Sequence, residues 1–104
     1  MIYEERSYQI APAHFREFLK KFEEEGLGLV RAHLGRLVAY FTTETGKLNT
    51  VVHIWAFDDL VDRDRRRQAM WSDPEWLTYV EQVMPWIEHM ETRLLKPTAF
   101  SPLQ

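Results

Sequence analysis

The chain has 104 residues, of which 45% are hydrophobic, so it holds enough apolar side chains for one folded core and is too short for two. Its 13 basic and 16 acidic residues give a formal net charge of -3, which excludes the strong positive field that attracts nucleic acid or anionic lipid. Cysteine is absent, which excludes disulfides and thiolate metal sites.

No apolar run approaches the ~20 residues that a membrane helix needs. The N-terminus enters strand-like sequence directly, without the basic and apolar segments of a secretion signal. We therefore expect one cytoplasmic domain over residues 1–104, with neither nucleic acid nor a membrane as a partner.

A strand and a helix begin the chain. Residues 2–10 mix bulky and charged side chains on both faces, which suits a strand in partly polar surroundings. Pro12 fits the first turn of the next helix, whose apolar face is marked by Phe15, Phe18, Leu19 and Phe22. Either this helix runs to about His33, with Gly26 allowing close approach of another segment, or it breaks at Gly26 and resumes. Gly35 is placed to end it as a left-handed cap.

Two strands joined by a turn follow. Residues 36–43 alternate as a strand does, and residues 44–47 supply turn chemistry. The next strand is apolar or aromatic on both faces, with Val51, His53, Trp55 and Phe57 on one and Val52, Ile54 and Ala56 on the other. Such a strand is covered on both sides. Helices supply one cover, and we expect a second copy of the chain to supply the other.

The first helix after this strand is strongly charged. Asp58 or Asp59 can cap it, and its acidic start and basic end match the helix macrodipole. The helical wheel places Asp64 between Leu60 and Trp71 on the covered face, where an aspartate needs a partner.

A second helix and a last strand complete the chain. Either Ser72 and Glu75 form a capping box, or Asp73 is the cap and Pro74 the first helical residue. Pro85 should distort or end this helix. A strand follows at about residues 88–95, and we expect the proline-interrupted tail after it to dock on a second subunit.

The order of these elements predicts an α+β fold of ferredoxin-like β-α-β-β-α-β type, a four-stranded antiparallel sheet with helices on one face. The other face would be an exposed apolar patch, whose hydration at ~25 cal/mol per Å2 is unfavourable. Stacking two sheets face to face removes this cost. We therefore predict a homodimer with two-fold symmetry.

Five blocks of sequence carry a resemblance to a known family. They are Tyr3-Glu4-x-Arg6-x-Tyr8, then His33-Leu34-Gly35-Arg36-Leu37-Val38 with Tyr40-Phe41, then Val52-His53-x-Trp55, Asp62-Arg63-x-x-Arg66-Arg67 and Asp73-Pro74-x-Trp76. In this order they cover nearly the whole chain, which closely resembles the NIPSNAP family. The resemblance implies a dimeric α/β barrel, in which the sheets of two ferredoxin-like subunits close together. It implies little about chemistry.

Several kinds of chemistry lack sequence support. The four histidines include no close pair, no glycine-rich loop precedes a lysine, and neither Ser7 nor Ser72 lies in a G-x-S-x-G elbow. We therefore expect no metal site and no cofactor.

A polar and aromatic set remains that could face the space between sheet and helices: Glu4, Arg6, Tyr8, Tyr40, His53, Trp55 and Asp64. The structural interpretation is that Arg6 forms a buried ion pair with Asp64, or with Glu4 through a neighbour, and that the aromatic residues are ordinary core. The functional interpretation is that Arg6 binds an anionic or carbonyl oxygen. His53 would then act as acid or base, because its unperturbed pKa is near neutrality, and Trp55 and Tyr40 would form aromatic walls.

The functional interpretation predicts a homodimeric barrel that binds a small molecule, as a cofactor-independent monooxygenase or an isomerase, by analogy with other dimeric α/β barrels. His53 and Arg6 are then the candidate catalytic residues, and the candidate pocket residues are Glu4, Tyr8, Tyr40, Trp55 and Asp64. The alternative is a non-catalytic interaction or scaffold protein. The sequence slightly favours binding and names no ligand.

Overall fold

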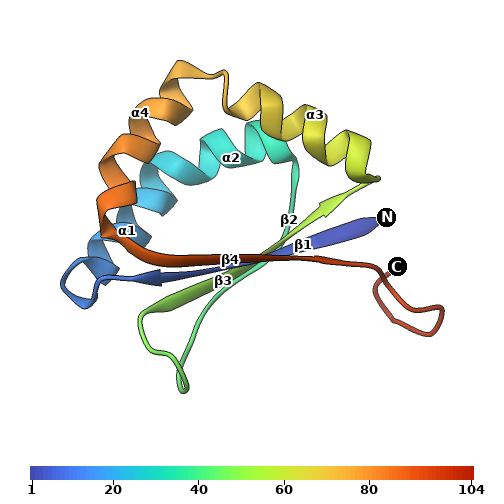
Figure 1. Cartoon of the computed structure of the whole chain (residues 1–104), viewed down its shortest axis with the longest axis horizontal. Coiled ribbons are helices and arrows are strands. Elements are labelled where there is room, and N and C mark those ends of the chain that lie inside the picture. The colour runs from blue at the N-terminus through green and yellow to red at the C-terminus, as the bar shows by residue number, and fades with distance from the viewer.

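The computed structural model describes residues 1–104 and places four antiparallel strands in one sheet, with all the helices over one of its faces (Figure 1). The strands are β1 (Ile2–Ile10), β2 (Arg36–Thr42), β3 (Thr50–Phe57) and β4 (Ile87–Leu95). They lie in the order β2-β3-β1-β4, so the first strand pairs with both the third and the fourth. The predicted ferredoxin-like fold is confirmed.

A continuous helical segment connects β1 to β2. It consists of a 3-10 turn (Pro12–His14), α1 (Phe15–Lys21), a π-helical turn (Phe22–Gly26) and α2 (Leu27–Leu34). The helix therefore continues through Gly26. Glycine lets Tyr79 approach closely, because a Cβ atom at this position would lie only 2.6 Å from Cζ of Tyr79. Gly35 then ends α2 with a φ of 85°, a conformation that glycine adopts without strain.

Two aspartates start the helices on the other side of β3. Asp59 caps α3 (Leu60–Met70), because its side chain accepts the backbone N–H of Asp62 at 2.8 Å. Asp73 caps α4 (Pro74–Val83) in the same way, by accepting the N–H of Glu75 at 2.9 Å. Of the two predicted starts for α4, the one with Pro74 as first residue is therefore correct. Pro85 lies in the 3-10 turn (Met84–Trp86) that ends the helix, as expected.

The predicted position of Asp64 on the covered face of α3 is wrong. Its side chain is 72% exposed, and its partner is the adjacent Arg63, 3.1 Å away. The prediction took Leu60 and Trp71 as the edges of an apolar stripe, but both are exposed. At 3.6 residues per turn, Asp64 lies about 200° around the helix from Asp62. The covered face instead carries residues four apart: Asp62, Arg66 and Met70.

Asp62 is a buried carboxylate that joins three segments. It accepts the backbone N–H of Asp58 at 3.0 Å and side-chain hydrogen bonds from Arg65 and Arg66. The backbone bond from Asp58 and then the bond from Arg66 hold the pKa of Asp62 below its usual range. Arg66 also donates to the carbonyl oxygen of His33 at 3.3 Å, so Asp62 connects the start of α3 to the end of α2.

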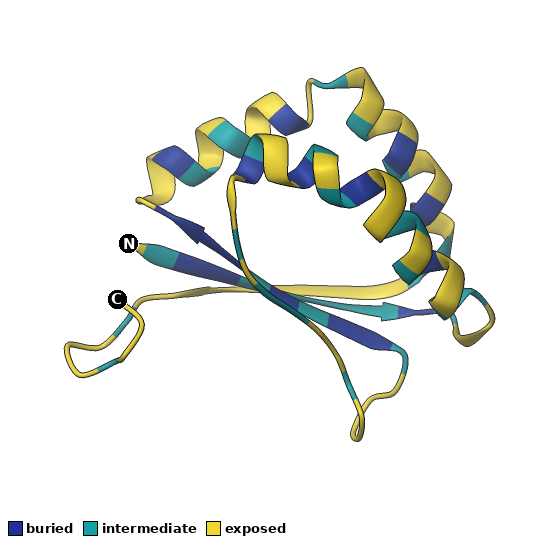
Figure 2. Cartoon of the chain, turned by 180° about the vertical axis from the view of Figure 1, so that it is seen from behind, coloured by how far each residue is buried: buried dark blue, intermediate teal, exposed yellow.

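The core lies between the sheet and the helices in two clusters. One contains Ile10, Phe18, Val51, Tyr79 and Val83, and the other Val30, Leu34, Trp55, Phe57 and Met70. One side of β3, with Val51, Trp55 and Phe57, supplies both clusters. By contrast, β4 is exposed along nearly its whole length (Figure 2).

The C-terminal tail returns to its own β1. The hydroxyl of Tyr3, on the sheet face away from the helices, donates to the carbonyl oxygen of Gln104 at 2.6 Å. Phe100, in the middle of the tail, stays 89% exposed. None of the helices combines the length and apolar content that crossing a bilayer requires.

Gly26 and Gly28 form a matched pair for testing the contact between the helical segment and α4. We expect Gly26→Ala to lower the free energy of unfolding by about 1–3 kcal/mol, because the new methyl group overlaps the Tyr79 ring. Gly28→Ala meets nothing within 4 Å and should stabilise the helix by up to about 1 kcal/mol. Urea unfolding of both variants checks this, and equal effects would contradict it.

Candidate functional site

A cavity of about 70 Å3 lies between the sheet and the helices. A single water needs about 10–15 Å3 by this kind of measure, so there is room for several water-sized groups. Of its 19 lining residues, 16 are hydrophobic or aromatic, and the exceptions are Arg6, His53 and Arg67. The cavity is therefore apolar with a few polar positions, which is the usual composition of a small-molecule site.

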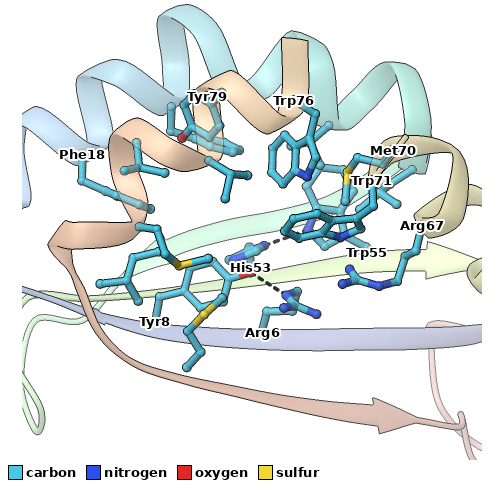
Figure 3. A pocket seen from close by; sticks show the side chains of 18 of the residues that line it. Arg6, Tyr8, Phe18, His53, Trp55, Arg67, Met70, Trp71, Trp76 and Tyr79 are labelled. Carbon is cyan, nitrogen blue, oxygen red and sulfur yellow. Dashed lines mark hydrogen bonds between the residues drawn. The ribbon is translucent and has the colours of Figure 1, made fainter. Parts of the chain in front are cut away.

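The structure brings five of the seven predicted site residues to this cavity: Arg6, Tyr8, Tyr40, His53 and Trp55. Figure 3 labels four of them, Arg6, Tyr8, His53 and Trp55. Glu4 lies next to Arg6 on the helix-facing side of β1, fully buried, and does not line the cavity. Asp64 is elsewhere, on the solvent side of α3. The binding or catalytic roles of these residues stay a prediction.

The sequence interpretation missed Arg67 and the aromatic residues Trp71, Trp76 and Tyr79, which the helices contribute to the cavity. Arg67 belongs to the basic end of α3, which the sequence pattern related only to the helix macrodipole. One signal could have found it, since Arg63, Arg67 and Met70 have the i, i+4, i+7 spacing of one helix face.

His53 is held by three aromatic neighbours. The indole Nε1–H of Trp55 donates to its Nδ1 at 2.7 Å. The Tyr40 ring stacks on the imidazole with centroids 4.7 Å apart, and the Tyr8 ring meets it edge-on at 4.9 Å. Because Nδ1 accepts a hydrogen bond, the proton of the neutral ring is on Nε2. That buried Nε2–H has no hydrogen-bond partner among the protein's own groups.

The electrostatic surroundings keep His53 neutral. Burial, and next the positive charge of Arg6, lower its pKa to about 3. This differs from the near-neutral pKa that the sequence suggested, and the acid–base role of His53 stays a prediction. At physiological pH the imidazole is a fixed hydrogen-bond donor.

Glu4 is the centre of a charged cluster at one end of the cavity. Its Oε2 accepts hydrogen bonds from Arg6 Nη1 at 3.2 Å, Arg63 Nη2 at 2.6 Å and Thr92 Oγ1 at 2.8 Å. Burial acts to raise the pKa of Glu4, but the bond from Arg63 and the charge of Arg6 outweigh it and hold the pKa below its usual range. Of the two predicted ion pairs, Arg6 with Glu4 is present and direct, and Arg6 with Asp64 is not.

Two further donors on lining side chains lack partners. The indole Nε1 of Trp76 and the hydroxyl of Tyr79 are buried without a hydrogen bond from or to the protein. Burial raises the pKa of Tyr79, so its phenol stays protonated. Together with His53 Nε2, three buried donors on cavity-lining side chains are therefore unpaired, and the Tyr79 hydroxyl among them lies beside Gly26. No group of histidine, aspartate or glutamate side chains converges as metal ligands would.

The NIPSNAP family model matches residues 3–102. The chain belongs to the NIPSNAP family. It is 37% identical over 103 residues to Protein NipSnap of Drosophila melanogaster, covering 99% of this chain and 37% of that protein. The chain thus spans little more than a third of the length of this relative, and 36% of Protein NipSnap homolog 1 of Danio rerio.

Solved structures support the same assignment. A NIPSNAP family protein of unknown function from Agrobacterium tumefaciens is 42% identical, with a TM-score of 0.96 over 100% of this chain and 94% of that chain. An antibiotic biosynthesis monooxygenase superposes with a TM-score of 0.63 over 94% of this NIPSNAP chain and 99% of that chain. Its identity is 15%, so it shares the fold alone.

The depressed pKa of His53 makes stability depend on pH in a defined direction. Between its ordinary value of 6.5 and about 3, the unfolded chain binds a proton at His53 that the folded chain does not. Stability should therefore fall as pH is lowered through this range, by about 2 kcal/mol between pH 7 and pH 5. Urea unfolding of His53→Gln should lack this contribution, whereas His89→Gln, at an exposed position, should keep it. Equal pH dependence in His53→Gln and wild type would contradict the prediction.

Proposed function

We propose that this NIPSNAP chain binds a small, largely apolar molecule in the cavity, as one subunit of a homodimer. The observation that carries the proposal is the combination of apolar and aromatic walls with three buried donors that the protein leaves unpaired. Each unpaired buried donor costs about 1–3 kcal/mol. A ligand with acceptor oxygens would remove that cost.

Exposed side chains mark the entrance to the cavity. Trp71, Met84 and Met90 line it and are 42%, 40% and 39% exposed, so it opens between the helices and β4. Methionine is flexible and adapts to different apolar shapes, which suits the mouth of a binding site. In a core with no binding role, large apolar side chains such as these would be buried by their neighbours.

The arrangement also supports a chemical role for the site. We propose that a ligand carbonyl is held by His53 Nε2–H, with Arg6 stabilising negative charge that develops on the oxygen. The same contacts would stabilise the enolate of an acidic ligand whose C–H proton passes to solvent water at the cavity mouth, and an enolate is the species through which a cofactor-independent monooxygenase or an isomerase acts. The shared fold with an antibiotic biosynthesis monooxygenase favours testing oxygen consumption first.

The sheet face away from the helices supports the homodimer. Along β2 and β3 this face is apolar, with Ala39, Phe41, Val52, Ile54 and Ala56. Along β1 and β4 it is polar and includes the ion pair of Glu5 with Arg93. Phe41 is 56% exposed in the single chain, and an apolar strip of this kind is typical of an interface.

Filling the cavity should abolish ligand binding without unfolding the protein. Val80 is half-buried on the cavity wall, whereas Leu77, on the same helix, is exposed and outside it. We expect Val80→Phe to lose binding of small aromatic ligands in a saturation-transfer NMR screen and Leu77→Phe to bind them as wild type does. A wild-type protein that binds none of the screened compounds would contradict the proposed function.

Introducing a charge on the outer sheet face should dissociate the dimer. We expect wild type to sediment as two copies and Ile54→Glu as one, because the new carboxylate would be buried without a partner in the interface. Val61→Glu is the control, since Val61 is 75% exposed on α3. A folded single copy of wild type at micromolar concentration in analytical ultracentrifugation would contradict the homodimer.

A further inference from the structure

Two arginines lie at one end of the cavity, and only one of them has an anionic partner. Arg6, from β1, contacts Glu4 and donates through Nε to the hydroxyl of Tyr8 at 2.6 Å. Arg67, from α3, lines the same cavity, and its side chain makes no hydrogen bond or ion pair with the protein. Figure 3 shows Arg6 reaching up from the strand layer and Arg67 reaching down from α3 toward the same part of the pocket, beside Trp55.

The carboxylates near this end of the cavity already have arginine partners, although one oxygen of Glu4, Oε1, is buried without a hydrogen bond. Glu4 is shared by Arg6 and Arg63, and no ion pair joins Arg67 to it. Asp64 contacts only Arg63 and is exposed, and Asp62 is held by Arg65 and Arg66. The protein therefore leaves positive charge unbalanced beside an apolar cavity.

Arg67 differs from an arginine that merely covers apolar surface in having a second cation, Arg6, close to it. Such a side chain lays its stem on the protein and keeps its guanidinium in water, away from other cations. Here burial, and next the charge of Arg6, lower the pKa of Arg67. Arg67 is half-buried, and holding two like charges near each other is unfavourable unless an anion comes between them.

We propose that the ligand is an amphipathic carboxylate whose charged group binds between Arg6 and Arg67 and whose apolar body lies in the aromatic cavity. This inference rests on the proposed function and names the class of ligand. Guanidinium groups suit a carboxylate because two parallel N–H groups match its two oxygens. The cavity of about 70 Å3 limits the apolar body to a ring or a short chain in this conformation.

Benzoate and benzyl alcohol are matched probes, because they share a ring and differ in charge. Binding would be measured by isothermal titration calorimetry on wild type, Arg67→Met and Arg65→Met. Arg65 is on the same helix, with a side chain that is 72% exposed, so its variant makes the same charge change outside the cavity. Loss of a charge-assisted contact should weaken benzoate binding about tenfold or more in Arg67→Met and leave benzyl alcohol unchanged. Arg65→Met should match wild type with both probes.

The outcomes separate this inference from the proposed function. If benzoate binds equally to wild type and Arg67→Met, or no better than benzyl alcohol, the carboxylate class is wrong while cavity binding stands. If neither probe binds wild type, both proposals fail. If inorganic phosphate displaces benzoate at equal concentration, the site takes free anions and the need for an apolar body is refuted.

A melting experiment without ligand tests whether Arg67 has only a structural role. Replacing an unpaired cation next to Arg6 should leave the melting temperature of Arg67→Met equal to or above that of wild type. Benzoate should raise the melting temperature of wild type and not that of the variant. A lower melting temperature for Arg67→Met without ligand would show that the fold needs this charge, and would overturn the inference.

Discussion

The buried carboxylate of Glu4 is the interaction on which the arrangement of this molecule depends. It takes hydrogen bonds from Arg6 on its own strand, from Thr92 on β4 and from Arg63 on α3, so one charge links the sheet to the helix layer. A carboxylate with no exposed surface is stable only with such partners. The same contacts fix Arg6 at the floor of the cavity and place α3 over it, which brings Arg67 opposite.

The charged side chains beside the cavity also determine which ligands the site can bind. Arg6 and burial keep His53 neutral, and the bond from Trp55 fixes its remaining proton on Nε2. The cavity thus offers hydrogen-bond donors and positive charge but no histidine that gains or loses a proton near neutral pH. Such a site suits the binding of oxygen-bearing ligands and the stabilisation of negative charge on them.

The sequence predicted those features of the structure that depend on residues close together in the chain. The alternation along residues 50–57 and the positive φ of Gly35 depend on neighbours in sequence and were readable there, and the caps at Asp59 and Asp73 were each one of two candidates that the sequence offered. The exposed position of Asp64, the unpaired Arg67 and the depressed pKa of His53 depend on contacts between distant segments. A helical wheel drawn through exposed residues gave the wrong face, because charged side chains, not apolar ones, cover the end of the sheet beneath α3.

A crystal structure of the protein grown with benzoate would test ligand binding in this cavity most directly. We expect electron density for the ring against Trp55 and Tyr40, with a carboxylate within hydrogen-bond distance of Arg67 and Arg6. A cavity filled by repacked side chains, with Arg67 turned out to solvent, would contradict a binding role for this part of the NIPSNAP fold.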